Sequence, residues 1–151
     1  MVYTELTKKA LRISFEAHKE QVDKGGVPYV YHPYHVAMQM DDEVSVCVAL
    51  LHDVVEDSPV TIGDLKIYGF PKEVTDAVAL LTHDDDTPYF DYIKRIKENP
   101  VARRVKIADL KHNSNNSRIS YFDHSVFERI NKYNKALDIL TSDDEYDEYN
   151  L

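Results

Sequence analysis

Apolar residues recur at intervals of three and four along nearly the whole chain, which is the periodicity of helices that bury one face. The first such stripe covers residues 6–17, and Thr4 precedes it as a candidate N-cap. Pro33 is placed to begin a second helix, because the first helical position needs no backbone N–H. No segment alternates apolar and polar residues convincingly enough to predict a strand.

Capping signals mark where the later helices begin and end. Thr61 and Asp64 have the spacing of a capping box, and Gly69 ends that short helix. Asn99 and Pro100 form a cap and first-position pair. Further apolar stripes lie at residues 36–40, 44–55, 74–81, 89–96, 101–112 and 127–140. The pattern predicts an all-α, single-domain bundle of about seven or eight helices.

Residues 50–57, Leu-Leu-His-Asp-Val-Val-Glu-Asp, place four ionisable groups on an otherwise apolar stripe. On one continuous helix, residues four apart share a face. Glu56 would then follow His52 by one turn, and Asp57 would follow Asp53. Burying so many ionisable groups is costly unless something compensates them, and a divalent cation is the usual compensation. The segment therefore predicts part of a metal-centred hydrolytic site.

Two further residues are candidates to complete the metal shell. His32 directly precedes a helix-starting proline, and we expect it to be exposed at the mouth of that helix. Asp109 falls on the apolar face of its predicted helix, an unusual position for an unpaired carboxylate. The predicted ligands are His32, His52, Asp53 and Asp109. Such mixed ligands with open positions suit Mn²⁺, Fe²⁺ or Mg²⁺ better than a closed structural zinc.

The remaining histidines have weaker sequence contexts. His112 follows Asp109 by nearly one turn, so we expect it to orient that carboxylate. We expect the others to lie outside the metal shell: His18, His35, His83 and His124.

Composition narrows the class of protein. The chain has 151 residues, of which 43% are hydrophobic and 30% charged, as in one globular domain. The N-terminal residues lack the apolar stretch of a signal peptide, no apolar run approaches the ~20 residues that a membrane span needs, and there is a single cysteine. From these features we expect a cytoplasmic protein. The net charge of −9 argues against nucleic-acid binding. We expect a domain over residues 1–140 and an acidic tail over 141–151.

Four strings of residues, in this order, resemble a known family: 17–21, 24–33, 50–57 and 106–113. They are similar to the HD superfamily of metal-dependent phosphohydrolases. More narrowly, they resemble the hydrolase domain of the Rel/Spo alarmone enzymes and their small single-domain relatives. The resemblance covers about residues 6–140 and implies an all-helical HD-type fold.

The resemblance also implies a metal ion, usually Mn²⁺, and removal of the 3′-pyrophosphate from guanosine tetra- or pentaphosphate. By position, the four predicted ligands match the family's metal ligands. Glu56 and Asp57 match the acidic pair that orients and deprotonates the attacking water. Asn113 matches a residue that contacts the nucleotide, and Lys24 lies in the loop that holds base and phosphates.

Two positions depart from the family pattern. The alarmone enzymes typically carry a basic residue just before the loop lysine, whereas this chain has Asp23 there. They also typically carry an arginine after the last metal aspartate, whereas this chain has Leu110. An aspartate near an anionic substrate reverses the local charge. The cations that are candidates to restore a phosphate patch are Lys24, Lys106, Lys111, Arg103, Arg104 and Arg118.

Three functions therefore stay open. The first is alarmone hydrolysis. The second is the same chemistry on a different nucleotide or phosphorylated metabolite, which the two departures favour. The third is a non-catalytic metal- or nucleotide-binding module, against which the intact Glu56–Asp57 pair speaks. The expected partner is a small nucleotide, without nucleic acid or membrane, and the sequence leaves the metal identity and the oligomeric state open.

Overall fold

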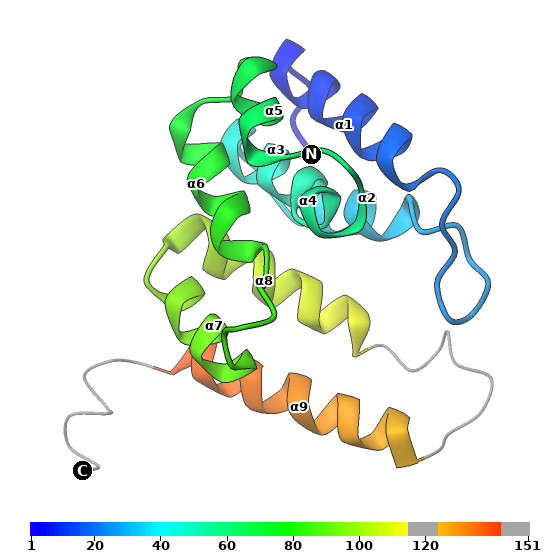
Figure 1. Cartoon of the computed structure of the whole chain (residues 1–151), viewed down its shortest axis with the longest axis vertical. Coiled ribbons are helices and arrows are strands. Elements are labelled where there is room, and N and C mark those ends of the chain that lie inside the picture. Colours follow the sequence, from blue (N-terminus) through cyan, green and yellow to red (C-terminus); the bar gives the residue numbers. More distant parts are fainter. Residues whose placement is uncertain (115–123, 143–151) are drawn as a thin grey trace.

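The computed structural model describes residues 1–114 and 124–142, and this part of the chain folds into nine helices without a named strand (Figure 1). The all-α prediction is confirmed. The helices are α1 (Glu5–His18), α2 (Tyr31–Met38), α3 (Glu43–Leu51), α4 (Val54–Asp57), α5 (Ile62–Ile67), α6 (Lys72–Leu81), α7 (Tyr89–Lys97), α8 (Pro100–Asn113) and α9 (His124–Thr141). Arg118 and residues 143–151 of the predicted acidic tail lie outside the described residues.

Side-chain caps begin several helices where the sequence predicts them. An N-cap side chain accepts a hydrogen bond from a backbone N–H that has no helical partner. The predicted caps Thr4, Thr61 and Asn99 begin α1, α5 and α8 in this way, and Asp42 caps α3. The prediction for α2 is wrong, because this helix begins at Tyr31 and Pro33 is its third residue. A proline is still tolerated there, since first-turn N–H groups need no partner within the helix.

The end of α5 shows why a glycine follows it. Gly69 has a φ of +94°, a conformation that side chains disfavour. In this geometry the N–H of Phe70 bonds to the carbonyl of Leu65 at 3.2 Å, and the N–H of Gly69 to that of Lys66 at 3.1 Å. These are the two bonds of a Schellman motif. The turn directs the chain into α6.

Helices α3 and α8 form the centre of the bundle. Every residue from Ser45 to Leu51 of α3 is buried, and α3 contacts α1, α2, α6 and α8. Helix α8 in turn contacts α2, α3, α6, α7 and α9. In Figure 1 it runs between the upper group of helices and the lower pair formed by α7 and α9. Helix α8 is therefore placed to bring side chains against both α2 and α3.

The prediction of one continuous helix through residues 50–57 is wrong. Helix α3 ends at Leu51, and α4 begins at Val54, with Asp53 as the residue before it. Asp53 has φ −105° and ψ −4°, at the edge of helical geometry, and its carbonyl accepts a hydrogen bond from the N–H of Asp57 at 3.0 Å. The break places His52 and Asp53 in a turn between two helices.

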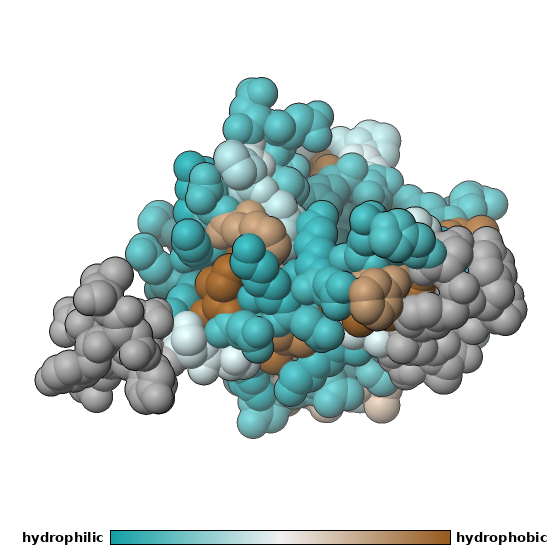
Figure 2. Space-filling model, turned by 90° about the horizontal axis from the view of Figure 1, so that it is seen from below, coloured by the Kyte–Doolittle hydropathy of each residue, from teal (hydrophilic) through white to brown (hydrophobic). Residues whose placement is uncertain are grey.

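The face of the molecule that is seen from below is largely polar. Figure 2, which views the molecule from below, shows mainly hydrophilic atoms with small, scattered hydrophobic areas. In residues 1–114 and 124–142, no helix combines the length and the apolar character that a membrane crossing requires.

The central position of α3 leads to a stability prediction. Leu50 is fully buried, so Leu50→Ala should lower the free energy of unfolding by about 2–5 kcal/mol through lost contacts and a cavity. Urea denaturation followed by circular dichroism measures this change. The control is Ile67→Ala, since Ile67 is 82% exposed, and it should change stability by no more than about 0.5 kcal/mol. Equal effects of the two variants would contradict the central role of α3.

Candidate metal centre

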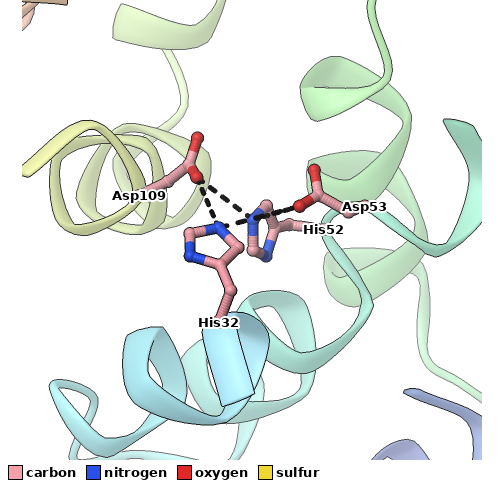
Figure 3. A group of neighbouring side chains, drawn as sticks. All are labelled: His32, His52, Asp53 and Asp109. Atoms are coloured by element: carbon pink, nitrogen blue, oxygen red, sulfur yellow. Dashed lines mark hydrogen bonds and ion pairs between the residues drawn. The ribbon is translucent and has the colours of Figure 1, made fainter. Parts of the chain in front are cut away.

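The structure brings the four predicted metal ligands together (Figure 3). His32 comes from the first turn of α2, Asp109 from α8, and His52 and Asp53 from the turn between α3 and α4. One ligand atom from each lies within 4.8 Å of all the others. His32 is only 3% exposed, so the expectation that it is exposed at a helix mouth is wrong. Among the described residues, this is the group of His, Asp and Glu side chains that can hold a metal ion.

The distances show that the donor atoms converge on one point. His32 Nε2 lies 2.8 Å from Asp109 Oδ1 and 3.7 Å from Asp53 Oδ2. His52 Nε2 lies 3.1 Å from Asp53 Oδ2 and 3.4 Å from Asp109 Oδ1. Yet His52 Nε2 is buried and neither oxygen is placed to form a hydrogen bond with it. A buried nitrogen that faces two carboxylates without hydrogen-bonding either of them fits a site built for a cation.

The hydrogen bonds of His52 fix its tautomer. Its Nδ1 lies 2.5 Å from the backbone carbonyl of Ala49, which only accepts hydrogen bonds. Nδ1 must therefore carry the proton, and in the neutral ring Nε2 keeps its lone pair. Histidines that bind metals commonly donate from their other nitrogen in this way. The donor set and the tautomer therefore fit a divalent metal ion.

His112 supports His32. The Nδ1 atoms of the two rings lie 2.6 Å apart, and the rings stack with centroids 4.9 Å apart. If His32 uses Nε2 as a ligand, its Nδ1 carries the proton and donates it to His112. The ring of His35 also stacks on that of His112, with centroids 4.1 Å apart, so three imidazole rings follow one another. The sequence suggested His112 as a residue that orients Asp109, and the structure shows that it also contacts His32.

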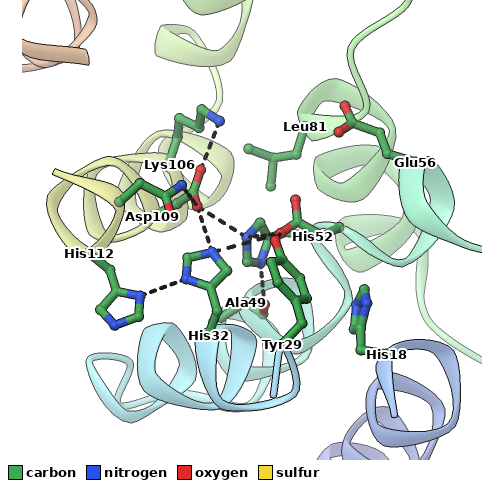
Figure 4. A network of polar contacts seen from close by, with 12 residues as sticks. His18, Tyr29, His32, Ala49, His52, Glu56, Leu81, Lys106, Asp109 and His112 are labelled. Carbon is green, nitrogen blue, oxygen red and sulfur yellow. Dashed lines mark hydrogen bonds and ion pairs between the residues drawn. The ribbon is translucent and has the colours of Figure 1, made fainter. Parts of the chain in front are cut away.

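Two residues predicted to bind substrate instead contact Asp109. Lys106 Nζ lies 2.8 Å from Asp109 Oδ2, and Asn113 Nδ2 donates to Asp109 Oδ1 at 3.0 Å (Figure 4). Burial would raise the pKa of Asp109, but the Lys106 ammonium and the two imidazoles hold that pKa well below its usual range. Asp109 is therefore kept ionised, which is the form that binds a cation.

The other predicted substrate contacts lie elsewhere. Lys24 is exposed in the loop between α1 and α2. Lys111 lines a cavity of about 310 Å³ between α2 and α8, together with His35, Gln39, Met40, Arg104, Ile107, Ala108 and His112. Arg104 bonds to both Asp41, at 2.8 Å, and Asp42, at 3.2 Å. Its charge is thus offset by two carboxylates, which weakens the predicted phosphate patch.

The two departures from the family pattern have structural explanations. Asp23 Oδ1 accepts hydrogen bonds from the N–H groups of Gly25, at 2.8 Å, and Val27, at 3.0 Å. This aspartate therefore shapes the loop that carries Lys24. Leu110 is fully buried and belongs to the core, so its side chain cannot reach a solvent-borne substrate.

The predicted acidic pair borders the ligand cluster without joining it. Glu56 and Asp57 lie on α4, and both are exposed. Glu56 Oε1 accepts a hydrogen bond from the backbone N–H of His83. Desolvation by the surrounding protein and the charge of Asp53 raise the pKa of both carboxyls. A raised pKa makes a carboxylate a better proton acceptor near neutral pH.

Tyr29 is a site residue that the sequence reasoning did not assign. It is mostly buried, and its hydroxyl donates a hydrogen bond to Asp53 Oδ2. Burial and the charge of Asp53 raise the pKa of Tyr29, so the hydroxyl keeps its proton. The sequence feature that could have indicated Tyr29 is its position between the loop lysine and His32 in the string 24–33.

His18 and Gln21 form a second unassigned group. His18 is fully buried at the end of α1, and its ring lies 5.1 Å from that of Tyr29. Its Nδ1 bonds to Gln21 Oε1 at 2.8 Å, and Gln21 Nε2 donates to the backbone carbonyl of Asp57 at 2.9 Å. This network ties α1 to α4. His18 lies outside the ligand cluster, as the sequence predicted.

An all-helical bundle whose centre gathers two histidines and two aspartates from three places has the architecture of an HD-type hydrolase. No protein-family model matches the chain. It is 32% identical over 114 residues to the guanosine-3′,5′-bis(diphosphate) 3′-pyrophosphohydrolase MESH1 of Mus musculus, covering 66% of this chain and 63% of that protein. A solved structure, described as a metazoan ortholog of SpoT that hydrolyses ppGpp, aligns with a TM-score of 0.74 at 23% identity, covering 94% of this chain and 89% of the other.

Two longer proteins match over shorter regions. A probable guanosine-3′,5′-bis(diphosphate) 3′-pyrophosphohydrolase of Mycoplasma pneumoniae is 41% identical over 81 residues, or 51% of this chain and 11% of that protein. The bifunctional (p)ppGpp synthase/hydrolase SpoT of Escherichia coli is 34% identical over 97 residues, or 61% of this chain and 14% of that protein. The chain thus covers less than two thirds of each of these relatives by sequence. It is a relative of the HD-type Rel/Spo hydrolases, and the resemblance inferred from its motifs is confirmed.

The hydrogen bond from Tyr29 to Asp53 leads to a prediction about metal affinity. Tyr29→Phe removes the hydroxyl that orients this carboxylate while keeping the ring. Loss of such a supporting hydrogen bond typically costs 10–100-fold in metal affinity or activity, so we expect about a tenfold or greater loss of affinity for Mn²⁺. Competition with a metal-sensitive dye measures it. Tyr31→Phe is the control, because Tyr31 is 61% exposed, and an unchanged affinity in both variants would exclude a role for Tyr29.

Proposed function

We propose that this chain is a metal-dependent pyrophosphohydrolase that removes the 3′-pyrophosphate from guanosine tetra- or pentaphosphate. The products are guanosine di- or triphosphate and pyrophosphate. The observation that carries the proposal is the convergence of three buried ligands and the partly buried Asp53 next to an exposed carboxylate pair. The activities named for the relatives support the choice of substrate.

The proposed ligands of the metal are His32, His52, Asp53 and Asp109, and Mn²⁺ is the proposed ion, with Fe²⁺ and Mg²⁺ as alternatives. When bound, a divalent ion supplies positive charge to phosphoryl oxygens and lowers the pKa of water. The protein's own part is to keep the ligands ionised and oriented. Lys106, Asn113 and Tyr29 do this for the two aspartates, and His112 does it for His32.

The acidic pair supplies the proton acceptor. Water attacks the phosphorus bonded to the 3′ oxygen, and its proton passes to the Glu56–Asp57 pair. The bond between phosphorus and the 3′ oxygen breaks, and that oxygen takes up a proton. The raised pKa of both carboxyls favours this transfer. We propose that Lys24, Lys106, Lys111 and Asn113 contact the substrate, Lys106 and Asn113 while they remain bonded to Asp109.

A second candidate is the same hydrolysis on a different nucleotide or phosphorylated metabolite. Asp23 favours it, because a carboxylate stays next to Lys24 in the loop where the family typically has a basic residue. A non-catalytic binding module is a third reading. The exposed carboxylates beside the ligand cluster speak against it, since binding alone needs no proton acceptor there.

The first test is product analysis. The Mn²⁺-loaded protein should convert guanosine tetraphosphate to guanosine diphosphate and pyrophosphate, identified by chromatography next to a panel of other nucleotides. A chelator should abolish the reaction, and added Mn²⁺ should restore it. Asp53→Ala should lose bound metal and activity together, because it removes a ligand. Cleavage of another nucleotide alone would support the second candidate, and no turnover on the whole panel would support the binding module.

The second test separates metal binding from proton transfer. The double variant Glu56→Ala with Asp57→Ala should keep its metal but lose about 10²-fold or more in turnover, as loss of a general base does. Metal content by elemental analysis and initial rates are the measurements. The matched control is Glu73→Ala with Asp76→Ala, an exposed carboxylate pair on α6. Turnover within a few fold of wild type in the first double variant would exclude the pair from catalysis.

A further inference from the structure

The loop between α6 and α7 reaches across to the candidate hydrolytic site. A hydrogen bond runs from the backbone N–H of His83 in this loop to Glu56 Oε1 on α4. His83 was expected to have no part in the metal shell, and it is not a ligand. It lies instead against one of the two carboxylates that the proposed hydrolysis needs. No local pattern in the sequence indicates this contact, because the two residues are 27 positions apart.

The loop is held in shape by its own side chains. His83 Nε2 bonds to the carbonyl of Thr87 at 2.6 Å, and the hydroxyl of Thr87 lies 3.0 Å from each carboxylate oxygen of Asp84. The His83 ring stacks on Tyr92 with centroids 4.5 Å apart. The Tyr92 hydroxyl in turn donates to the carbonyl of Leu81, at the end of α6, at 2.7 Å. The imidazole of His83 thus links both ends of the loop.

The two members of the acidic pair differ in how they are held. Glu56 has one carboxylate oxygen fixed by the loop, so its rotamer is restricted. Asp57 is held through its backbone, whose carbonyl accepts from Gln21 and whose N–H donates to Asp53. Its carboxylate has no hydrogen bond or ion pair within residues 1–114 and 124–142. Within the described residues, the structure therefore combines one carboxylate anchored by a hydrogen bond with one that has no such anchor.

We propose that the 82–88 loop is a positioning element for hydrolysis, in which His83 is the positioning residue and acts through Glu56. The loop fixes Glu56 Oε1, so that Oε2 accepts one hydrogen of the attacking water and orients it. Asp57 takes the other proton as the new oxygen–phosphorus bond forms. The 3′ oxygen leaves as its bond to phosphorus breaks, and it receives the proton. This assignment rests on the proposed hydrolysis and gives the two carboxylates separate tasks.

A double-mutant cycle tests whether His83 acts through Glu56. His83→Ala should lower kcat by about tenfold or more, since small misplacements in an active site cost up to ~10²-fold, with KM and metal content unchanged. In the Glu56→Ala background, His83→Ala should lower kcat no further. The control is His124→Ala, because the His124 side chain is 85% exposed. Independent, multiplicative losses in the double variant would overturn the proposal.

A second measurement does not depend on activity or on the folding of His83→Ala. In the ¹H–¹⁵N spectrum, the His83 amide proton should resonate downfield, as for a hydrogen bond to a carboxylate, and should move upfield in Glu56→Ala. Asp57→Ala should leave that resonance in place. If the chemical shift of the His83 amide proton does not change in Glu56→Ala, the contact is absent and the proposal is overturned. If the contact holds but the wild-type protein cleaves no nucleotide, the proposed function fails and the loop assignment as a catalytic device fails with it.

Discussion

The structure depends on placing two carboxylates, those of the buried Asp109 and the partly buried Asp53, against the same point. Like charges in a weakly solvated interior repel, and each also loses hydration. The chain compensates with the imidazoles of His32 and His52 between them and with the ammonium of Lys106 behind Asp109. Because these groups come from α2, α8 and the turn after α3, the three elements must pack together for any of the charges to be compensated.

The break between α3 and α4 serves this arrangement. On a continuous helix, His52 and Asp53 would point about 100° apart, so that both could not face one point directly. Ending α3 at Leu51 and restarting at Val54 turns the two side chains so that His52 Nε2 and Asp53 Oδ2 lie 3.1 Å apart. The same turn gives Glu56 and Asp57 on α4 a different direction from the one they would have on a continuous helix. It lies at the rim, exposed, where it meets the loop from α6 instead of the core.

Local signals in the sequence predicted much of this. Caps such as Thr61 depend on residues three positions apart, and the ligands stood out because charged groups interrupted apolar stripes. What the sequence did not predict depends on packing between distant segments. Asn113 and Lys106 were expected to meet a substrate because both are polar residues near Asp109, but only the fold shows that their donors contact that ligand. Tyr29 and His83 form hydrogen bonds to residues 24 and 27 positions away, which is too far along the chain for helical periodicity to indicate.

The proposed hydrolysis needs both a cation site and a proton acceptor, and the two pairs of carboxylates differ in the way that these tasks require. Cations and hydrogen-bond donors surround Asp53 and Asp109, and the pKa of Asp53 is brought down to about 2 by His52 against the effect of burial. For Glu56 and Asp57, desolvation by burial and the charge of Asp53 outweigh the effect of nearby cations, so their pKa values move in the opposite direction. The surroundings thus divide the four carboxylates into a pair with lowered pKa values and a pair with raised ones. Along the chain, the short turn at His52 and Asp53 separates the environment of the ligand cluster from that of the exposed pair on α4.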